Sequence, residues 1–339
     1  MEYLFISSGW INALLNEFER SHLDIDLLTS GLPGFEGGYY SDSERLELFS
    51  ARLLWHRAEQ YSSDPLIGAR IGLSDNLRSI GVLAPLIWHS DTIAKIFENI
   101  SRYQTLISEN GAFKIEMTSQ PGIFHCVYHE TPAAIRSSFQ QVLSVATALI
   151  NIARKVTDNR VVVQKLYVPE FSACRELGEL LCLPVEIKGP QICIELKIDL
   201  DRLNEKIMGC DQHLYGICQE YARSLLAKKD AGMEVIEGVR RFVSANGYGH
   251  ADVESCASEL KLHPRNLQRA LRKAGTNFRS IKEEVSKEFA VILINESNDI
   301  QYIAEQLGYS ELSGFYRIFK SWFGITPKKA IKDGLFGVN

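Results

Sequence analysis

The 339-residue sequence lacks the features of a secreted protein, of a membrane-spanning protein and of a protein stabilised by a structural metal. Its seven cysteines are odd in number and none are spaced as CxxC, which argues against a disulfide framework and against a zinc ribbon. Its apolar stretch Ile80–Trp88 is far shorter than the roughly 20 residues a membrane-spanning helix needs. No Lys or Arg precedes Arg20 and no long apolar run follows, unlike a signal peptide. We therefore expect a cytoplasmic protein with reduced thiols and no membrane contact.

The common motifs of enzymes and cofactor sites are also missing. The chain has no GxSxG nucleophile elbow, no P-loop and no GxGxxG opening a helix. We therefore predict that it is not an enzyme and that it uses neither a cofactor nor a metal. His125 and His129 would share one face of a strand. Two histidines without a nearby carboxylate are weak grounds for a metal site, so we interpret them as structural.

Charge is unevenly distributed along the chain. The net charge is −5, but residues 251–339 hold 13 Lys or Arg against 11 Asp or Glu, whereas residues 1–250 hold 24 against 31. Nucleic-acid binding requires a local basic face rather than a basic whole. The asymmetry is mild and supports such binding only weakly. The length suits two domains of ordinary globular composition.

The N-terminal two thirds mix helical and strand patterns. Gln120–Gly122 and Lys188–Pro190 are turn signals between strand-like runs, and Asp91 is a candidate N-cap. The expected result is an α+β domain in which helices cover a small, mostly antiparallel sheet. The expected helices are 10–20, 42–60, a stretch that starts with 81–88, 91–109 and 135–156, and the expected strands are 112–118, 123–129, 161–168, 185–187 and 192–196.

An amphipathic helix over residues 213–227 follows this domain. One stripe of it carries Leu214, Ile217, Tyr221 and Leu225, which fits packing within the chain or a dimer seam equally well. Lys228–Gly232 is polar and contains glycine, which makes it the best linker candidate. We therefore divide the chain into an α+β domain over 1–212, a helix and linker over 213–232, and an all-α domain over 233–339.

A pattern in the last domain occurs twice. From Val253 and from Ile300 the same residue types recur at an offset of 47, and the later positions recur at an offset of 48. One residue has therefore been gained just after Tyr309. Because insertions are tolerated at turns and resisted inside packed helices, each copy reads as two short helices joined by a tight turn. The sequence thus predicts two helix-turn-helix motifs.

Local signals agree with this reading of both copies. Asp252 and Asp299 are expected to cap the first helix of each motif, and Ser310 the second helix of the second motif. Pro264 suits the first turn of its helix, and glycines are expected to end the second helices. A long helix over 278–296 joins the motifs. Its expected buried stripe is Ile281, Val285, Phe289, Ile292 and Leu293, and the helix-ending glycines are Gly275 and Gly324.

The second helix of each motif pairs an apolar face with a polar face. Arg reads guanine, and Asn or Gln reads adenine, by paired hydrogen bonds in the major groove. The faces therefore predict binding to double-stranded DNA. The candidate DNA-binding residues are Arg265, Asn266, Gln268, Arg269 and Arg272 in the first motif, and Leu312, Ser313, Gly314, Arg317 and Lys320 in the second.

Residues 235–332 resemble the DNA-binding domain of the AraC/XylS family of bacterial transcription regulators, most strongly over Ile303–Pro327. The resemblance implies that the base-reading positions are Arg265, Gln268, Arg269, Leu312, Ser313, Gly314 and Arg317. The chain departs from the family where a Tyr-Arg pair usually follows the final Pro, since it has Ala330–Lys332 there. It also has His263 and Pro264 in place of a Ser-rich N-cap.

Residues 20–205 more loosely resemble the arabinose-binding-like sensor domain found in relatives of AraC. The matching stretches are Gly31–Pro33, Asp64–Gly68, Gly81–Leu83 and Arg102–Gln104. The resemblance implies a sequence-specific transcription activator that responds to a small-molecule effector, forms a homodimer and contacts RNA polymerase. One alternative is a ligand-independent regulator whose N-terminal domain only dimerises or contacts a protein partner. Another is an enzyme with a DNA-binding tail, which would need a reactive cysteine.

Overall fold

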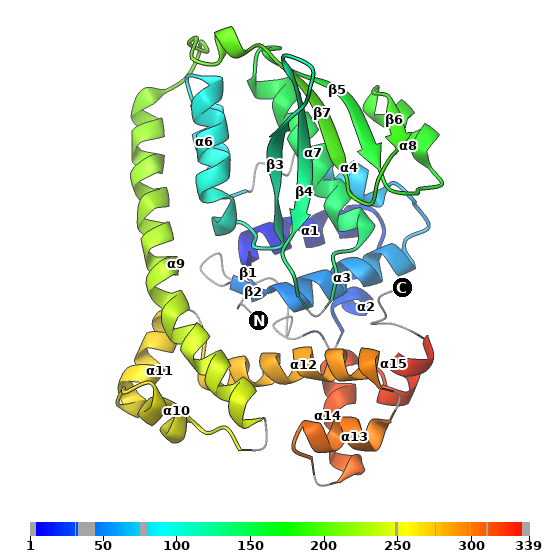
Figure 1. The fold of residues 1–339 in the computed structure, drawn as a ribbon, viewed down its shortest axis with the longest axis vertical. Helices are drawn as coiled ribbons and strands as arrows, with labels where there is room; N and C mark the ends of the chain where they lie inside the picture. Colours follow the sequence, from blue (N-terminus) through cyan, green and yellow to red (C-terminus); the bar gives the residue numbers. More distant parts are fainter. Residues whose placement is uncertain are drawn as a thin grey trace.

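The computed structural model describes residues 5–30, 32, 45–74, 80–133, 135–247, 250–274, 276–297, 299–309 and 311–333. The expected helix end at Gly275 and the expected cap at Ser310 lie outside these residues. Figure 1 shows an N-terminal body of helices and a sheet above a layer of C-terminal helices, with the long helix α9 along one side. No helix among the described residues is long and apolar enough to cross a bilayer.

The chain starts with a two-stranded antiparallel ribbon and a layer of helices. Burial of one apolar face holds this layer together, for example Ile11 and Phe18 of α1 against Trp55 of α3. The cap of α6 is Thr92 rather than the expected Asp91, which pairs instead with Lys95 at 2.6 Å. The elements are β1 (Phe5–Ser7), α1 (Ser8–Arg20), α2 (Ile25–Thr29), β2 (Arg45–Glu47), α3 (Leu48–Tyr61), α4 (Ile67–Leu73), α5 (Leu83–Trp88) and α6 (Ile93–Tyr103).

The expected small, mostly antiparallel sheet is confirmed. Its strand order is β3-β4-β7-β5-β6, and only the β5–β6 pair is parallel. One face of the sheet packs on α7 and α6 (Figure 1). The other face carries polar side chains such as His125 and Glu195. The elements are β3 (Gly111–Met117), β4 (Ile123–Glu130), α7 (Phe139–Val156), β5 (Val161–Val168), α8 (Cys174–Leu181), β6 (Val185–Ile187) and β7 (Cys193–Ile198).

The two histidines of β4 lie on the polar face of the sheet. Contrary to the expectation that no carboxylate is near, His125 Nε2 lies 3.5 Å from Glu195 and His129 Nε2 lies 3.1 Å from Glu116. Among the described residues, no three His, Cys, Asp or Glu side chains gather as a metal site requires. Each histidine thus has a single carboxylate partner.

Two glycines let α4 lie directly on α7. A Cβ built on Gly68 would stand 2.1 Å from the Gln140 carbonyl oxygen, and one on Gly72 would stand 1.9 Å from Thr147 Oγ1. Neither position has room for a methyl group, so the two backbones approach closely only because both residues are glycine. This contact fixes α7, and with it the helical wall that faces the sheet.

The prediction of a linker at Lys228–Gly232 is wrong, because these residues lie within a continuous helix. Helix α9 runs without interruption over Gln212–Asn246, 35 residues. Its side chains are tied to the N-terminal domain at two levels, since Tyr215 accepts a hydrogen bond from Asn99 and Lys229 pairs with Glu109 at 2.6 Å. The Lys229 and Glu109 side chains are only 12% and 10% exposed. A buried ion pair in the middle of the segment explains why it is helical rather than a loose connection.

Beyond α9, two helix-turn-helix motifs are present as predicted. Asp252 and Asp299 cap α10 and α13 through their carboxylates. Helix α14 begins one residue later than a Ser310 cap requires, with Glu311 at its N-cap, and Gly324 ends it at φ 73°. The helices are α10 (Val253–Glu259), α11 (Pro264–Lys273), α12 (Phe278–Glu296), α13 (Ile300–Gln306), α14 (Leu312–Phe323) and α15 (Pro327–Asp333).

The two motifs are packed against different parts of the protein. The first motif shares a core with the C-terminal half of α9 and the start of α12, through residues such as Val239, Leu267 and Ile281. The second motif shares one core with α1–α3 of the N-terminal domain. The expected stripe of α12 is wrong at Phe289, which is 40% exposed, since Ala290 and Val291 are turned inward in its place.

Arg57 and Phe49 of α3 form the contact between the N-terminal domain and the second motif. The rings of Phe49 and Phe323 lie 5.9 Å apart, edge to face. The Arg57 guanidinium donates to the carbonyls of Leu28 and Ser30 at 2.9 and 2.7 Å, and to the carbonyl of Phe323 at 3.3 Å. Burial lowers the Arg57 pKa, and these three carbonyls satisfy the buried charge. The C-terminal end of α14 is thereby fastened to α2 and α3.

We predict opposite effects on stability for two glycine-to-alanine substitutions. Gly72→Ala forces α4 away from α7 and should lower the free energy of unfolding by about 1–3 kcal/mol. Gly216→Ala adds a methyl group to an open helical position with nothing within 4 Å, and should raise it by about 0.5–1 kcal/mol. Urea unfolding followed by circular dichroism measures both. Equal effects of the two variants would contradict the close packing of α4 on α7.

Candidate DNA-binding surface

Helix α11 presents a polar face away from its core. His263 is its N-cap, with Nδ1 accepting from the Arg265 N–H at 3.2 Å, and Pro264 occupies the first turn. Leu267 and Leu271 are fully buried. All five candidate residues of this helix are exposed: Arg265, Asn266, Gln268, Arg269 and Arg272.

Two of these side chains are linked on the surface of α11. The Arg269 guanidinium donates to Asn266 Oδ1 at 3.3 Å, one turn earlier on the helix. The bond joins an arginine and an amide, the two side-chain types that pair with base edges in the major groove. It orients Arg269 toward the N-terminal end of α11.

Helix α14 has a smaller and less polar exposed face. Phe315 and Phe319 are fully buried and Trp322 is 2% exposed, so the helix turns its opposite side outward. Four of the five candidate residues are exposed, namely Leu312, Ser313, Arg317 and Lys320, and Gly314 is half-buried.

At Gly314 no side chain projects from the N-terminal end of α14. The nearest atom to a Cβ built on it is Tyr309 Cδ1 at 3.8 Å, so a side chain would fit there within the protein. Its absence leaves the helix backbone accessible to a close partner between Leu312 and Arg317. Ser313 Oγ lies 3.3 Å from the Glu311 carboxylate, which accepts its hydroxyl proton.

The ten candidate residues thus form two separate groups, one at each end of α12 (Figure 1). Helix α12 has 19 residues, which corresponds to a length of about 28 Å at 1.5 Å per residue. Successive major-groove segments on one side of a DNA duplex are about 34 Å apart. The length of α12, which joins the two motifs, is therefore close to the spacing that two helices need to enter adjacent segments.

The position of α11 depends on a buried ion pair that sequence reasoning missed. Arg240 of α9 contacts Glu288 of α12 at 2.5 Å, and the two side chains are 3% and 14% exposed. Burial raises the Glu288 pKa, while the neighbouring Arg240 opposes that rise. Lys282 of α12 donates to the Ala251 carbonyl at 2.6 Å. These contacts join α9, α10 and α12 around the first motif, and no local periodicity could have indicated them.

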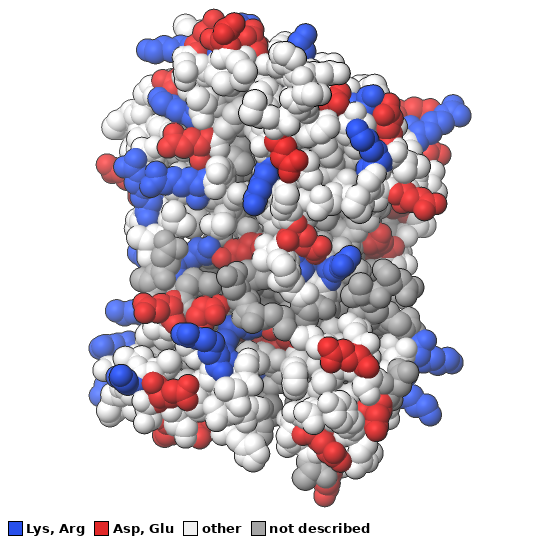
Figure 2. Space-filling view, viewed as in Figure 1, with Lys and Arg blue, Asp and Glu red and all other residues white. Residues whose placement is uncertain are grey.

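The charges on the visible face of the C-terminal helices are of both signs. Figure 2 shows Lys and Arg interspersed with Asp and Glu over α10 to α15, without a continuous basic stripe on that side. This agrees with the small charge excess of residues 251–339. Exposed cations are found on α11 and α14, for example Arg269 and Arg317, and also beyond them, at Lys261, Lys328 and Lys329.

Two family models match the chain. A model described as a helix-turn-helix domain covers residues 256–333, and one described as the arabinose-binding domain of AraC transcription regulators, N-terminal, covers residues 40–177. The second match lies within residues 20–205, and the first lies within residues 235–332 except for its last residue, so each coincides with the region that resembles the corresponding AraC domain. The resemblance is thus confirmed for both halves of the chain.

Relatives match over most of the chain. The ornithine utilization regulator of Pseudomonas aeruginosa is 24% identical over 293 residues, which cover 85% of this chain and 84% of that protein. An HTH-type transcriptional regulator of Mycobacterium tuberculosis is 29% identical over 279 residues, 80% of each chain. Among solved structures, the transcriptional regulator CdpR from Pseudomonas aeruginosa aligns over 98% of this chain and 99% of its own at 17% identity, with a TM-score of 0.47. These relatives are regulators and not enzymes.

The cysteines bear on the alternative of an enzyme with a DNA-binding tail, because a nucleophilic cysteine must ionise. Burial raises the pKa of Cys126 to about 12, with a further contribution from Cys193. Burial, together with Glu259, raises the pKa of Cys256 to about 11. Burial also raises the pKa of Cys210. These thiols remain protonated near neutral pH.

We predict that iodoacetamide at pH 8 modifies the exposed Cys182 and leaves Cys126 and Cys256 intact in the folded protein. At this pH a thiol with a pKa of about 11 is ionised in only about one molecule in a thousand, and its rate of alkylation should rise as the pH approaches that value. Peptide mass mapping before and after unfolding in urea measures the result. Modification of Cys126 or Cys256 as fast as Cys182 would revive the enzyme alternative.

Proposed function

Because the chain belongs to the AraC/XylS family of transcription regulators, we propose that it binds one specific DNA site through α11 and α14 and activates transcription in response to a small molecule. The observation that carries this proposal is the pair of exposed polar helix faces at the two ends of α12. The protein works in the cytoplasm as a homodimer and contacts RNA polymerase. The effector binds in the N-terminal domain.

The first motif supplies most of the base reading. Arg265, Gln268 and Arg269 are exposed on one face of α11, and arginine and glutamine make paired hydrogen bonds to guanine and adenine. Arg272, at the C-terminal end of the helix, is placed for a phosphate. Phosphate contacts fix the register of the protein on the duplex without reading its sequence.

The second motif reads fewer bases and relies more on shape. Arg317 and Lys320 are its exposed cations, and Ser313 is its exposed hydroxyl. Leu312 cannot form hydrogen bonds but suits contact with a thymine methyl group, which the major groove presents at A·T pairs. Gly314 lets the backbone of α14 come close to the DNA edge.

A stripe on α9 supports assembly into a dimer. Leu214, Ile217 and Tyr221 lie at three- and four-residue spacing and are 38%, 54% and 57% exposed, while Tyr215 and Ala222 on the other side of the helix are buried in the N-terminal core. Exposed apolar residues at this spacing form the seam of paired helices. A second copy of α9 would cover the stripe.

The main alternative is a ligand-independent regulator. In that case the N-terminal domain serves only to hold the second motif, through Phe49 and Arg57, and to dimerise. The two proposals differ in whether occupancy of the N-terminal domain changes DNA affinity. A cavity of about 400 Å³ between the sheet and helices α6 and α7 favours the effector-responsive regulator, because a domain that only dimerises has no need of it.

We predict that Arg269→Ala weakens binding to the best genomic site by about 1–3 kcal/mol and relaxes base preference at one position. Arg317→Ala should alter preference at different base pairs, about one helical turn away. Arg175→Ala, an exposed arginine on α8, is the control and should leave both unchanged. Selection from a randomised duplex library measures all three. A loss by Arg269→Ala that is equal on all sequences would make Arg269 a phosphate contact instead.

We predict that Leu214→Gln with Tyr221→Gln converts a dimer into a monomer. The matched control is Glu220→Gln with Arg223→Gln, two exposed positions away from the stripe that leave the net charge unchanged. Sedimentation velocity at micromolar concentration gives the mass of each. A stripe variant that keeps the parent's mass would mean that this stripe is not a dimer interface.

A further inference from the structure

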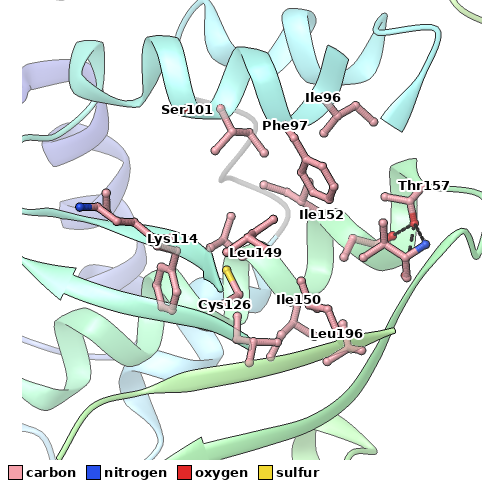
Figure 3. A pocket seen from close by; sticks show the side chains of 18 of the residues that line it. Ile96, Phe97, Ser101, Lys114, Cys126, Leu149, Ile150, Ile152, Thr157 and Leu196 are labelled. Carbon is pink, nitrogen blue, oxygen red and sulfur yellow. Dashed lines mark hydrogen bonds between the residues drawn. The ribbon is translucent and has the colours of Figure 1, made fainter. Parts of the chain in front are cut away.

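A cavity lies between the sheet and helices α6 and α7 (Figure 3). Its volume is about 400 Å³, within the range of roughly 300–1,000 Å³ usual for small-molecule sites. Its walls come from α6, α7 and strands β3, β4, β5 and β7. The sheet and the helical wall are therefore not in full contact, although α7 is fixed by its glycine contact with α4.

The interior of this cavity is apolar. Figure 3 shows apolar side chains from both the helices and the sheet surrounding the cavity, namely Ile96, Phe97, Leu149, Ile152 and Leu196. Among the described residues that line it, Lys114 is the only one with a charged side chain, and it is exposed. Figure 3 shows its ammonium pointing away from the other labelled side chains.

The polar groups of the walls are at the edge or already engaged. Ser101 is exposed and stands at the rim. Thr157 Oγ1 donates to the Ala153 carbonyl at 2.6 Å. The Cys126 thiol is protonated because burial raises its pKa to about 12. Gln104 is the one remaining polar side chain among the described lining residues, and these residues therefore offer very few hydrogen bonds in the deep part of the cavity.

A smaller cavity of about 130 Å³ shares part of this wall. Ile100, Gln104, Phe113 and Leu149 line both. The smaller cavity extends to Trp55 of α3, and Gln141 Oε1 on its wall is buried without a hydrogen-bond partner among the described residues. It thus connects the larger cavity to the helix that carries Phe49 and Arg57.

We propose that the larger cavity binds an apolar small molecule, aliphatic or aromatic in body and with at most one or two polar groups, and that it does not bind a sugar. A pentose carries a hydroxyl or ring oxygen on every carbon, and each one that is buried without a partner is costly. The walls supply too few partners for them. The name of the matching domain therefore does not describe the ligand of this chain.

This inference rests on the proposed function in one respect, because the ligand is taken to be the effector. A molecule between α6, α7 and the sheet bears on the wall shared with the smaller cavity. That cavity is bounded by α3, which holds the end of α14 through Arg57. A ligand that prefers one position of α3 would therefore shift the placement of the second motif.

The test uses the full-length protein and the neutral apolar dye N-phenyl-1-naphthylamine. We expect saturable binding at one site per chain, seen as a rise in dye fluorescence, and no competition from a large excess of L-arabinose. Ala153→Leu fills the larger cavity and should weaken dye binding by about tenfold or more. Ala148→Leu on the same helix faces only the smaller cavity and is the matched control, with an expected change below about twofold.

Val163→Leu, on the sheet side of the same cavity, should weaken binding as well and keeps the test valid if Ala153→Leu does not fold. Absence of dye binding to the parent protein, or equal binding by parent and both filled variants, overturns the proposal. Calorimetric binding of L-arabinose that Ala153→Leu abolishes would also overturn the proposal.

Specific DNA binding is measured on the same samples. If the parent protein shows no specific DNA binding, the proposed function is wrong. If dye binding leaves DNA affinity unchanged, the assignment of the ligand as the effector is wrong.

Discussion

The second helix-turn-helix motif completes its apolar core with side chains from the N-terminal domain. Phe315, Phe319 and Phe323 of α14 belong to the same buried cluster as Phe49 and Trp55 of α3. Arg57 adds directional contacts, because its guanidinium joins carbonyls of α2 to the last turn of α14. The placement of α14 is therefore a property of the whole protein rather than of the C-terminal domain alone.

The first motif is placed by different contacts. It packs on α9 and α12, and the buried pair Arg240–Glu288 joins those two helices. Helix α9 is in turn tied to the N-terminal domain through Lys229 and Glu109. Both α11 and α14 are thus held in position by the N-terminal domain. Helix α14 contacts it directly through α3, whereas α11 is connected to it through α9. Helix α12 joins the two motifs.

This arrangement gives a physical route from a ligand to DNA affinity. Under the proposed function α11 and α14 enter the groove together, so a shift of one relative to the other would change DNA affinity without any change in the contacting residues. The cavities lie beside α7 and α3, next to the contact that positions α14. Linkage requires that DNA binding change ligand affinity by the same factor.

Local features of the sequence predicted much of the DNA-binding surface. The repeat offset located both turns, and Asp252, Pro264 and Asp299 act at the helix starts as their types suggest. Ser310 was a reasonable cap by composition, but α14 starts at Leu312 after Glu311.

Features that depend on distant contacts could not be read from the sequence. Lys228–Gly232 has the composition of a linker, yet the burial of Lys229 against Glu109 keeps it helical. Phe289 fits an apolar stripe by spacing, yet its side chain is 40% exposed while Ala290 and Val291 are buried. The core shared by Phe49 and Phe323 joins residues 274 positions apart, and the apolar cavity arises from the fit of four strands to two helices. Neither leaves a periodic signal along the chain.

We propose that α11 and α14 read adjacent major-groove segments at a separation set by α12. Guanine-methylation interference on the best genomic site of the full-length protein is a direct test of this arrangement. We expect two clusters of interfering guanines on one side of the duplex, with centres about 10 base pairs apart. A single cluster, or two clusters on opposite sides of the duplex, would contradict it.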